Sequence, residues 1–350
     1  MGRRAFTNVA ANIDTLIESV ASAATDWDFE HAIEWEIAFV LDGLLAAGGD
    51  DEFVRELVDR CIETQTSEGQ LAGGSLTVFE GEWEPDWTEG EYTSVADPSS
   101  IGHSVLELYD RTGDDRYLDA ARRQYEYLRD SERTSEGGIR QQRSRQSLCV
   151  DGLWMFCPFL ARYGRMTDTE EAVEDAVHQF EVQARHLHTD SGLFRHTWAE
   201  QPDRFMNSAF WTGGNGFALM ALVDTLEYLP ADHEGRETLT ELFRETAAAM
   251  LDYQDRSGFW HNVVDDPHEP LETSGTLMTA YALQRGTEMG ILTDSAYAEA
   301  AERAMSVCRG VVSDDGRVGR VAKVPGGRNA PLGVELHGQG LFLLTASQFS

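Results

Sequence analysis

Seven consecutive apolar residues decide the fold: Phe217-Ala218-Leu219-Met220-Ala221-Leu222-Val223. A helix that is apolar on every side must be buried on every side. The segment over 235–254 is different, because its apolar residues recur at i, i+3 and i+4 and its other face is charged. These apolar residues are Leu239, Leu242, Phe243, Ala247, Met250 and Leu251. This periodicity predicts an amphipathic helix. The two segments therefore predict an inner helix over 215–229 followed by an outer helix over 235–254.

The same pair of helices recurs along the chain, and similar turns separate one pair from the next. Each turn has a polar or acidic pair, then glycine, then an apolar residue, at 66–71, 135–139, 190–194, 255–260 and 314–318. The other predicted pairs are 32–48 with 51–66, 100–112 with 115–130, 151–164 with 169–187, and 274–289 with 294–312. A sixth inner segment covers 339–348, and a helix near 8–23 is its natural outer partner. Six inner and six outer helices predict an all-α fold, the (α/α)6 barrel.

The rival architecture is a two-domain helical bundle. Two domains would need a linker, and the sequence contains no Pro/Ser/Gly-rich stretch of that kind. We therefore expect residues 1–350 to form a single barrel domain.

The charge of the chain is extreme. It has 61 acidic and 28 basic residues, a formal net charge of −33, and Lys323 is its one lysine. The acidic residues are spread over helix surfaces, which is typical of adaptation to a salt-rich cytoplasm that screens their repulsion. So negative a surface argues against nucleic acid or an anionic membrane as a partner.

The remaining composition points to a cytoplasmic protein. The four cysteines lie in apolar runs without CxxC spacing, so we expect buried free thiols: Cys61, Cys149, Cys157 and Cys308. The arginines at the N-terminus precede no apolar signal-peptide segment. No apolar run reaches the roughly 20 residues that span a bilayer.

In such a barrel the inner helices all begin at one rim, so the residues beside their starts converge on one cavity. Asp151 lies at such a start, at the head of the apolar run 152–156. An unpaired charge in apolar surroundings is unfavourable, so this carboxyl either finds partners or takes up a proton that it can deliver. The alternative is that Asp151 only caps its helix. For Asp97, which precedes Pro98, capping is favoured over catalysis.

Imidazoles and indoles accompany these carboxylates. His196 and His261 occupy matching places after their glycine turns, although His261 could simply bond a carbonyl. The wider rim set comprises His103, His337, Trp35, Trp154, Trp198, Trp211 and Trp260. Carboxylates with aromatic rings in a concave site are typical of sugar binding, although each tryptophan could equally belong to the core. No spacing indicates a metal site, and we expect no cofactor.

Six blocks resemble the unsaturated uronyl hydrolases of glycoside hydrolase families 105 and 88. In family order over roughly residues 30–348 they are Val150-Asp151-Gly152-Leu153-Trp154-Met155, Gly192-Leu193-Phe194-Arg195-His196-Thr197-Trp198, Phe210-Trp211-Thr212-Gly213-Gly214-Asn215-Gly216-Phe217-Ala218, Trp260-His261-Asn262-Val263-Val264-Asp265-Asp266-Pro267, Leu271-Glu272-Thr273-Ser274-Gly275-Thr276 and His337-Gly338-Gln339-Gly340. The resemblance is closer to family 105, and it implies the same (α/α)6 barrel.

The resemblance also implies a reaction. These enzymes act on the 4,5-unsaturated uronic acid that polysaccharide lyases leave at the non-reducing end of an oligosaccharide. They hydrate the C4=C5 bond, and the resulting hemiketal collapses and releases the next sugar. By resemblance, Asp151 is the general acid and base, and Asp97 matches the second aspartate. The expected substrate-binding residues are His196, Trp211, Asn215, Phe217, Trp154, His261, Arg140 and Trp35.

One departure from the family pattern affects substrate binding. Family 105 members usually read Trp-x-Arg-Gly-Asn-Gly-Trp, whereas Gly213 and Phe217 stand here in place of the arginine and the second tryptophan. That arginine would be the obvious partner of a substrate carboxylate. We therefore expect another arginine to replace it, and the candidates are Arg140, Arg143, Arg145 and Arg195.

Two other functions stay open at this point. A sugar epimerase on the same barrel would use paired histidines such as His196 and His261. A catalytically degenerate barrel would only bind sugars, and Gly213 makes this plausible. In each case the expected partner is a small sugar, which for the hydrolase is an unsaturated oligosaccharide. The sequence leaves the parent polysaccharide and the oligomeric state undetermined.

Overall fold

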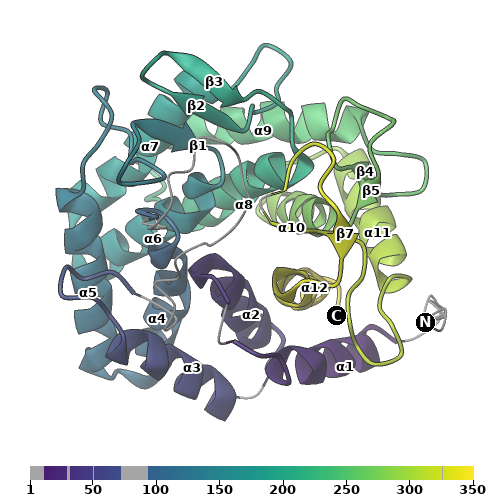
Figure 1. Ribbon diagram of the computed structural model, residues 1–350, viewed down its shortest axis with the longest axis horizontal. Coiled ribbons are helices and arrows are strands. Elements are labelled where there is room, and N and C mark those ends of the chain that lie inside the picture. The colour runs from purple at the N-terminus through teal and green to yellow at the C-terminus, as the bar shows by residue number, and fades with distance from the viewer. Residues whose placement is uncertain (1–11, 30–31, 50, 72–93, 325) are drawn as a thin grey trace.

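The computed structural model describes residues 12–29, 32–49, 51–71, 94–324 and 326–350. Within these ranges twelve helices form two concentric rings (Figure 1). The inner ring consists of α2 (Glu34–Ala46), α4 (Pro98–Thr112), α6 (Gly152–Thr167), α8 (Thr212–Tyr228), α10 (Ser274–Glu288) and α12 (Leu336–Ala346). The outer ring consists of α1 (Ile13–Thr25), α3 (Asp51–Glu63), α5 (Asp115–Asp130), α7 (Glu170–Leu187), α9 (Arg236–Asp252) and α11 (Ser295–Arg309).

The inner ring is closed. Each inner helix packs against the next inner helix along the chain, and α12 packs against α2. Each outer helix lies behind an inner one, with α1 behind α12 (Figure 1). This arrangement confirms the predicted (α/α)6 barrel and the partnership of the N-terminal helix with the last inner helix. Residues 8–11 of that predicted helix lie outside the described ranges. The closure supports a single domain over 1–350, which stays a prediction.

Burial separates the two rings as the apolar patterns predicted. In α8 every residue from Thr212 to Val223 is buried. In α9 burial is confined to one face, which includes Leu239, Leu242, Phe243, Ala247 and Met250. Each large apolar side chain fully removed from water contributes about 1.5–3 kcal/mol to folding. The inner helices therefore gain from packing on all sides, and the outer helices from a single face.

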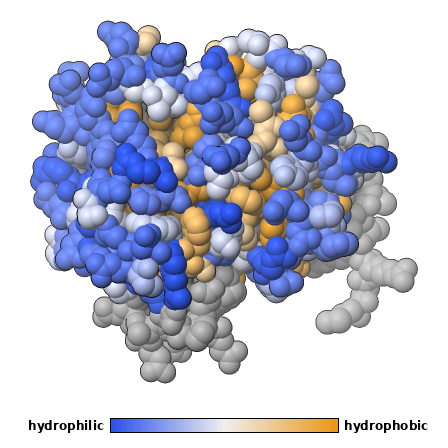
Figure 2. All heavy atoms as spheres, turned by 90° about the horizontal axis from the view of Figure 1, so that it is seen from above, coloured by the Kyte–Doolittle hydropathy of each residue, from blue (hydrophilic) through white to orange (hydrophobic). Residues whose placement is uncertain are grey.

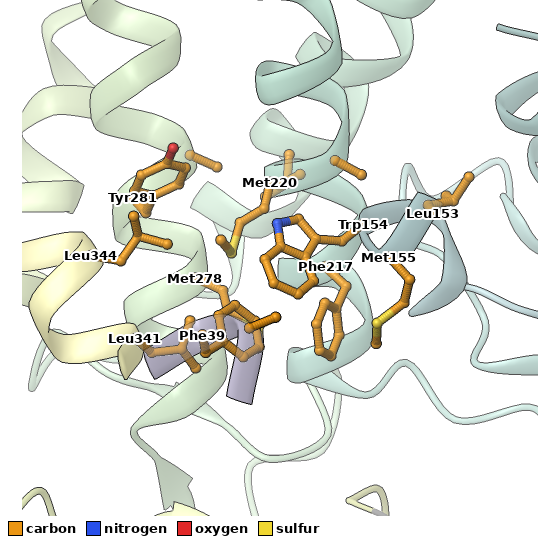
Figure 3. Packing of buried hydrophobic residues seen from close by; sticks show 14 of the residues in the cluster. Phe39, Leu153, Trp154, Met155, Phe217, Met220, Met278, Tyr281, Leu341 and Leu344 are labelled. Carbon is orange, nitrogen blue, oxygen red and sulfur yellow. The ribbon is translucent and has the colours of Figure 1, made fainter. Parts of the chain in front are cut away.

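Aromatic and apolar side chains fill the barrel below the starts of the inner helices. Phe39 of α2 stacks on Trp154 of α6 with ring centroids 4.2 Å apart, and Phe217 of α8 lies 5.8 Å from Trp154 (Figure 3). Met278 of α10 and Leu341 of α12 are buried in the same cluster. Five inner helices contribute to this packed apolar layer. It lies below the rim of the barrel and is called the apolar floor.

The five glycine turns share one structure. Each glycine has a positive φ that favours glycine: 106° at Gly69, 85° at Gly137, 80° at Gly192, 99° at Gly258 and 75° at Gly316. Two residues later, a backbone N–H donates to a buried side chain of a helix. These pairs are Leu71–Gln124, Ile139–Gln179, Phe194–Asn215, Trp260–Thr276 and Val318–Gln339. The sequence repeat is therefore a repeated turn that a polar side chain ties to the barrel.

Short antiparallel sheets connect outer helices to the following inner helices. They are β1 (Ser147–Cys149) with β2 (Thr197–Ala199) and β3 (Arg204–Asn207), β4 (Trp260–His261) with β5 (Leu271–Glu272), and β6 (Val321–Ala322) with β7 (Leu332–Gly333). The first sheet pairs Cys149 with Thr197. Its register brings the residue before β2, His196, beside the start of α6.

Two predicted starts of inner helices differ from the structure by three residues. Helix α8 begins at Thr212 and not at 215, because Gly213 and Gly214 are themselves helical. Helix α12 begins at Leu336 and not at 339, which places His337 in its first turn. Both changes lengthen an inner helix toward the rim.

The polarity of the surface and the state of the cysteines agree with the predictions from the sequence. Hydrophilic residues cover most of the described surface in Figure 2, with hydrophobic residues visible between them. All four cysteines are buried free thiols. Within the described ranges, no helix is long and apolar enough to cross a membrane.

Candidate active site

The six inner helices begin at one rim of the barrel. The residues immediately before their first turns are Ile33, Asp97, Asp151, Trp211, Thr273 and Glu335. Because the first N–H groups of each helix are directed to this rim, six helix dipoles favour an anion there. Asp97, Asp151 and Trp211, which were predicted to share this rim, all lie on it.

Asp151 faces His196. The Nε2 atom of His196 lies 3.3 Å from Oδ2 of Asp151, and the Val150 N–H donates to the His196 carbonyl at 3.0 Å. Asp151 is the N-cap residue of α6, but its side chain makes no capping hydrogen bond to the helix. The Oδ1 atom of Asp151 is buried and has no hydrogen-bond partner among the described residues. One oxygen therefore faces His196, and the other has its hydrogen-bonding capacity unused within the described chain.

Asp97 is a further carboxyl of the rim, and it is buried. Its exposed fraction is 1%, and Gln141 donates from Nε2 to its Oδ1 at 3.0 Å. Its side chain does not cap α4 either. Burial, followed by the charges of Glu34 and Asp151, raises the pKa of Asp97 well above its usual value. Asp97 therefore stays protonated when an ordinary aspartate is ionised.

Two neighbours of the Asp151–His196 pair were not predicted from the sequence. Asn207, at the end of β3, lies with Nδ2 3.0 Å from Nδ1 of His196. Cys149 has its sulfur close to the same groups, and burial followed by the charge of Asp151 raises the pKa of this thiol. Cys149 was identifiable from its place two residues before Asp151. Asn207 was not, because only the pairing of β2 with β3 brings it to His196.

Within the described part of the chain, one group has the spacing of a metal site. Ligand atoms of Cys149, Asp151 and His196 lie within 4.8 Å of one another. A histidine that binds a metal through Nε2 normally donates its Nδ1–H to an acceptor. Here the Oδ1 atom of Asn207 accepts from the Ala209 N–H, so the NH2 group of Asn207 faces Nδ1 of His196 and donates to it. The surroundings of the three residues therefore do not fit a metal ion.

Trp211 lies beside His196, with ring centroids 5.0 Å apart. Its Nε1–H donates to Oδ1 of Asn262 at 3.2 Å. A Cβ atom at Gly213 or at Gly326 would collide with the indole. The missing side chain at position 213 therefore makes room for the ring of Trp211, which gives a steric reason for this departure from the family pattern.

Asn215 positions the segment that carries His196. It accepts from the Phe194 N–H at 2.8 Å and donates to the carbonyls of Phe194 and Trp211 at 3.1 and 3.0 Å. Its side chain is fully buried. Because both amide hydrogens are already engaged, Asn215 acts on the shape of the rim.

The aromatic candidates divide between floor and rim. Trp154 and Phe217 are 1% and 2% exposed and belong to the apolar floor. Trp35 is half-buried and lies nearer the rim, with its ring 4.9 Å from that of His337. A role of these three in substrate binding stays a prediction, and the geometry favours Trp35.

His261 faces away from Asp151 and His196. Its Nδ1 bonds the carbonyl of Glu269 at 2.6 Å, and its Nε2 lies 3.9 Å from Asp255. This carbonyl bond is the alternative that the sequence left open. Since the imidazole of His261 faces these two residues and that of His196 faces Asp151, the paired histidines of an epimerase are not assembled here.

The four candidate arginines differ in their partners. Arg140 pairs with Glu132, and Arg143 pairs with Glu68. Arg195 lies over the rings of Phe205 and Phe210. Arg145 is half-buried. Within the described ranges the polar contact of its guanidinium is with the sulfur of Met206, 4.0 Å away. Arg145 and Arg195 are therefore the two candidates whose guanidinium has no carboxylate partner within the described ranges, and that of Arg195 already donates to the Ser208 carbonyl at 2.7 Å.

A family model for Glycosyl Hydrolase Family 88 matches residues 10–349. The chain belongs to this family. This membership agrees with the resemblance of the sequence blocks to families 105 and 88.

Two curated relatives are similar to parts of this chain. The unsaturated rhamnogalacturonyl hydrolase YesR of Bacillus subtilis is 29% identical over 236 residues, 64% of this chain and 65% of the relative. An unsaturated 3S-rhamnoglycuronyl hydrolase of an Alteromonas species is 30% identical over 209 residues, 57% of this chain and 50% of the relative. The matched regions thus span less than two thirds of these relatives.

A solved structure extends the likeness to the whole barrel. A possible member of family GH105 from Klebsiella pneumoniae superposes with a TM-score of 0.81 at 22% identity, covering 100% of this chain and 95% of the other. At this identity the likeness concerns the fold.

Proposed function

We propose that the protein is an unsaturated uronyl hydrolase. Its substrate is a 4,5-unsaturated uronic acid at the non-reducing end of an oligosaccharide made by a polysaccharide lyase. The observation that carries the proposal is the Asp151 carboxyl, with one oxygen 3.3 Å from His196 and the other buried without a partner. Family membership supports the reaction class, and the named activities of the relatives support the substrate class.

In the proposed reaction Asp151 moves two protons. It first gives a proton to C4, which leaves positive charge on C5 and the ring oxygen. The same carboxylate then takes a proton from the water that bonds to C5. The product is a hemiketal at C5, which opens and releases the next sugar with its hydroxyl proton. Because burial raises the pKa of Asp97 well above its usual value, the second aspartate adds no negative charge beside the Asp151 carboxylate.

We further propose that Arg145 binds the substrate carboxylate. The guanidinium lies against the sulfur of Met206 in β3, the strand that ends at Asn207, so Arg145 lies at the three-strand sheet that also carries His196 to the start of α6. A guanidinium forms two parallel hydrogen bonds with a carboxylate. Arg140 is the weaker candidate because Glu132 already occupies it.

The net negative charge of the chain affects how its activity depends on salt concentration. A net charge of −33 repels an anionic uronate at low ionic strength. At about 1 M salt the screening length falls to about 3 Å, so the repulsion is confined to near contacts. We propose a cytoplasmic, salt-adapted enzyme, and we expect kcat/KM to rise as KCl is added from low ionic strength.

The test of the activity uses its chromophore. The C4=C5 bond conjugated with the carboxylate absorbs in the ultraviolet, and hydration removes this absorbance. We expect unsaturated disaccharides from pectin or ulvan lyases to lose it with the wild-type protein and not with Asp151→Asn. No absorbance change with any unsaturated disaccharide would refute the assignment. Calorimetric binding without turnover would instead favour a barrel that only binds sugars.

A further inference from the structure

A cavity opens at the end of the barrel opposite the candidate active site. All six inner helices line it, from the indole of Trp154 to helix-terminal residues such as Ala46 and Tyr228. Trp154, Tyr281 and Leu344, which belong to its lining, are seen in Figure 3. The cavity measures about 280 Å³, slightly below the roughly 300–1,000 Å³ of sites for drug-sized ligands. It therefore has room for a compact molecule.

Two aspartates line this cavity from opposite walls. Asp42 belongs to α2 and Asp224 to α8, and two inner helices lie between them in either direction around the ring. Each is held by the next inner helix. Nδ1 of His103 lies 3.3 Å from Oδ2 of Asp42, whose Oδ1 accepts from Ser104 at 2.6 Å. Tyr281 donates to Oδ1 of Asp224 at 2.9 Å, and Oδ2 has no hydrogen-bond partner among the described residues.

The guanidinium groups around the cavity pair with its glutamates. Arg162 donates to Glu107 at 2.6 Å, and Arg111 donates to the same carboxylate at 2.8 Å. Arg285 donates to Glu227 at 2.5 Å. The two aspartates consequently have no arginine or lysine partner within the described ranges, so the carboxyl groups on the opposite walls are the ones without a full positive charge beside them.

His103 leaves one nitrogen of this cavity unused. Its imidazole belongs to the lining and is 12% exposed, and its Nε2 has no hydrogen-bond partner among the described residues. In the neutral ring Nδ1–H donates to Asp42, so Nε2 is an acceptor that lacks a donor. The cavity therefore holds oxygen and nitrogen acceptors whose capacity the described chain does not fill.

The electrostatic potential at this end of the barrel favours a cation. The inner helices begin at the rim of the candidate active site, so their last carbonyls and the negative ends of their dipoles are directed to the opposite end. The lining has four carboxyl groups and three guanidinium groups. The indole of Trp154 adds an aromatic surface that attracts cations.

The spacing of the acidic groups favours an organic cation over a bare divalent ion. Within the described part of the chain, no three acidic or histidine side chains of this cavity bring ligand atoms within 4.8 Å of one another. An alkylammonium ion is larger than a metal ion and supplies N–H donors together with an apolar body. Leu344 and Trp154 provide apolar surface for that body between the two aspartates.

We propose that this cavity binds a small organic ammonium ion between Asp42 and Asp224. The inference goes beyond the proposed function and does not depend on it, because the site lies at the other end of the inner helices.

Binding at this site is expected to release a proton. Burial raises the pKa of Asp224 to about 7, against the hydrogen bond from Tyr281. A cation beside the carboxylate lowers that pKa again, so binding at pH 6 should release up to about one proton, and affinity should rise up to about tenfold between pH 6 and pH 7. The other titratable and charged groups that act on Asp224 are Arg285 from α10, Glu227 from α8 and His103 from α4, while Arg162 from α6 lies over the ring of Tyr228.

Calorimetry with the full chain tests the proposal, with n-butylammonium as the ligand. n-Butanol has nearly the same shape without the charge and is the matched ligand control. In dilute KCl at pH 7 we expect one butylammonium ion per chain and no binding of butanol. Asp224→Asn should weaken binding by about tenfold or more. Asp232→Asn removes a carboxylate at an exposed position after the same helix and should leave binding unchanged.

Proton release gives the second readout, from titrations in buffers of different ionisation enthalpy. The wild type should release protons at pH 6, and Asp224→Asn should release none. The proposal is overturned if butylammonium does not bind or if butanol binds equally well. An equal loss in Asp224→Asn and Asp232→Asn would also overturn it, because it would indicate diffuse attraction by the acidic surface. Since neither readout needs turnover, this site and the proposed hydrolase activity can fail separately.

Discussion

Gly326 packs its backbone directly against the indole of Trp211. The glycine belongs to the connection between β6 and β7, whereas Trp211 immediately precedes α8. The contact joins two connections of the rim that are far apart in sequence. It leaves no space for a Cβ atom, and the φ of Gly326, 76°, is one that favours glycine.

We expect Gly326→Ala to weaken substrate binding more than it weakens the fold. The backbone strain costs about 1 kcal/mol, and the new methyl group displaces the Trp211 ring from beside His196. Gly290→Ala is the matched control, because its φ is 69° and its Cβ atom would meet nothing. Urea unfolding should show a loss for both variants. KM should rise for Gly326→Ala alone, and equal KM values would contradict the contact.

Asn215→Ala should lower both stability and activity. Three hydrogen bonds to buried backbone atoms are lost, which we expect to cost about 2–4 kcal/mol. The freed Phe194 segment carries His196, so kcat should also fall, by tenfold or more.

The matched control for this variant lies at another turn of the same type. Gln339 accepts from the Val318 N–H at 3.1 Å, as Asn215 does from Phe194. Gln339→Ala should therefore lower the urea midpoint while kcat stays near that of the wild type. A comparable loss of kcat in both variants would show that any loosened turn disturbs catalysis, and would remove the special role of the Phe194 segment.

Much of the barrel was predictable because its signals are local. The fully apolar inner segments and the one-sided outer segments report burial directly, and the glycine turns mark each repeat. Asp151 was predictable for a similar reason, since a carboxyl at the head of an apolar run is visible in the sequence itself.

Non-local contacts were not predictable. Asn207 reaches His196 only through the register of a three-strand sheet, and Gly326 reaches Trp211 only across the rim. A matching place after a glycine turn does not predict where a side chain points. His261 occupies the same place as His196, yet its ring faces Glu269. Position in a repeat predicts the rim, and side-chain direction depends on strand pairing.

Asp224 makes stability depend on pH. Burial raises the pKa of this carboxyl to about 7, although it accepts a hydrogen bond from Tyr281. A raised pKa in the folded state stabilises fully below the pKa of the unfolded chain, near 4, and this contribution is lost as pH rises toward about 7. Each pH unit of that window is worth up to about 1.4 kcal/mol.

Asp224→Asn removes this titration. We expect the free energy of unfolding, from urea curves between pH 4 and pH 8, to fall less steeply with rising pH in the variant than in the wild type. Asp232→Asn, at an exposed position after the same helix, should follow the wild-type slope. If the two variants had the same slope, Asp224 would not be the group that titrates.

Arg145→Ala should raise KM for an unsaturated uronide. A charge-assisted hydrogen bond contributes about 1.5–3 kcal/mol, which corresponds to a 10- to 100-fold change in binding. Since the guanidinium has no carboxylate partner among the described residues, its removal should affect stability little. Arg143→Ala is the matched control, because that guanidinium already pairs with Glu68. Should KM rise for Arg143→Ala and stay constant for Arg145→Ala, the substrate carboxylate would bind elsewhere on the rim.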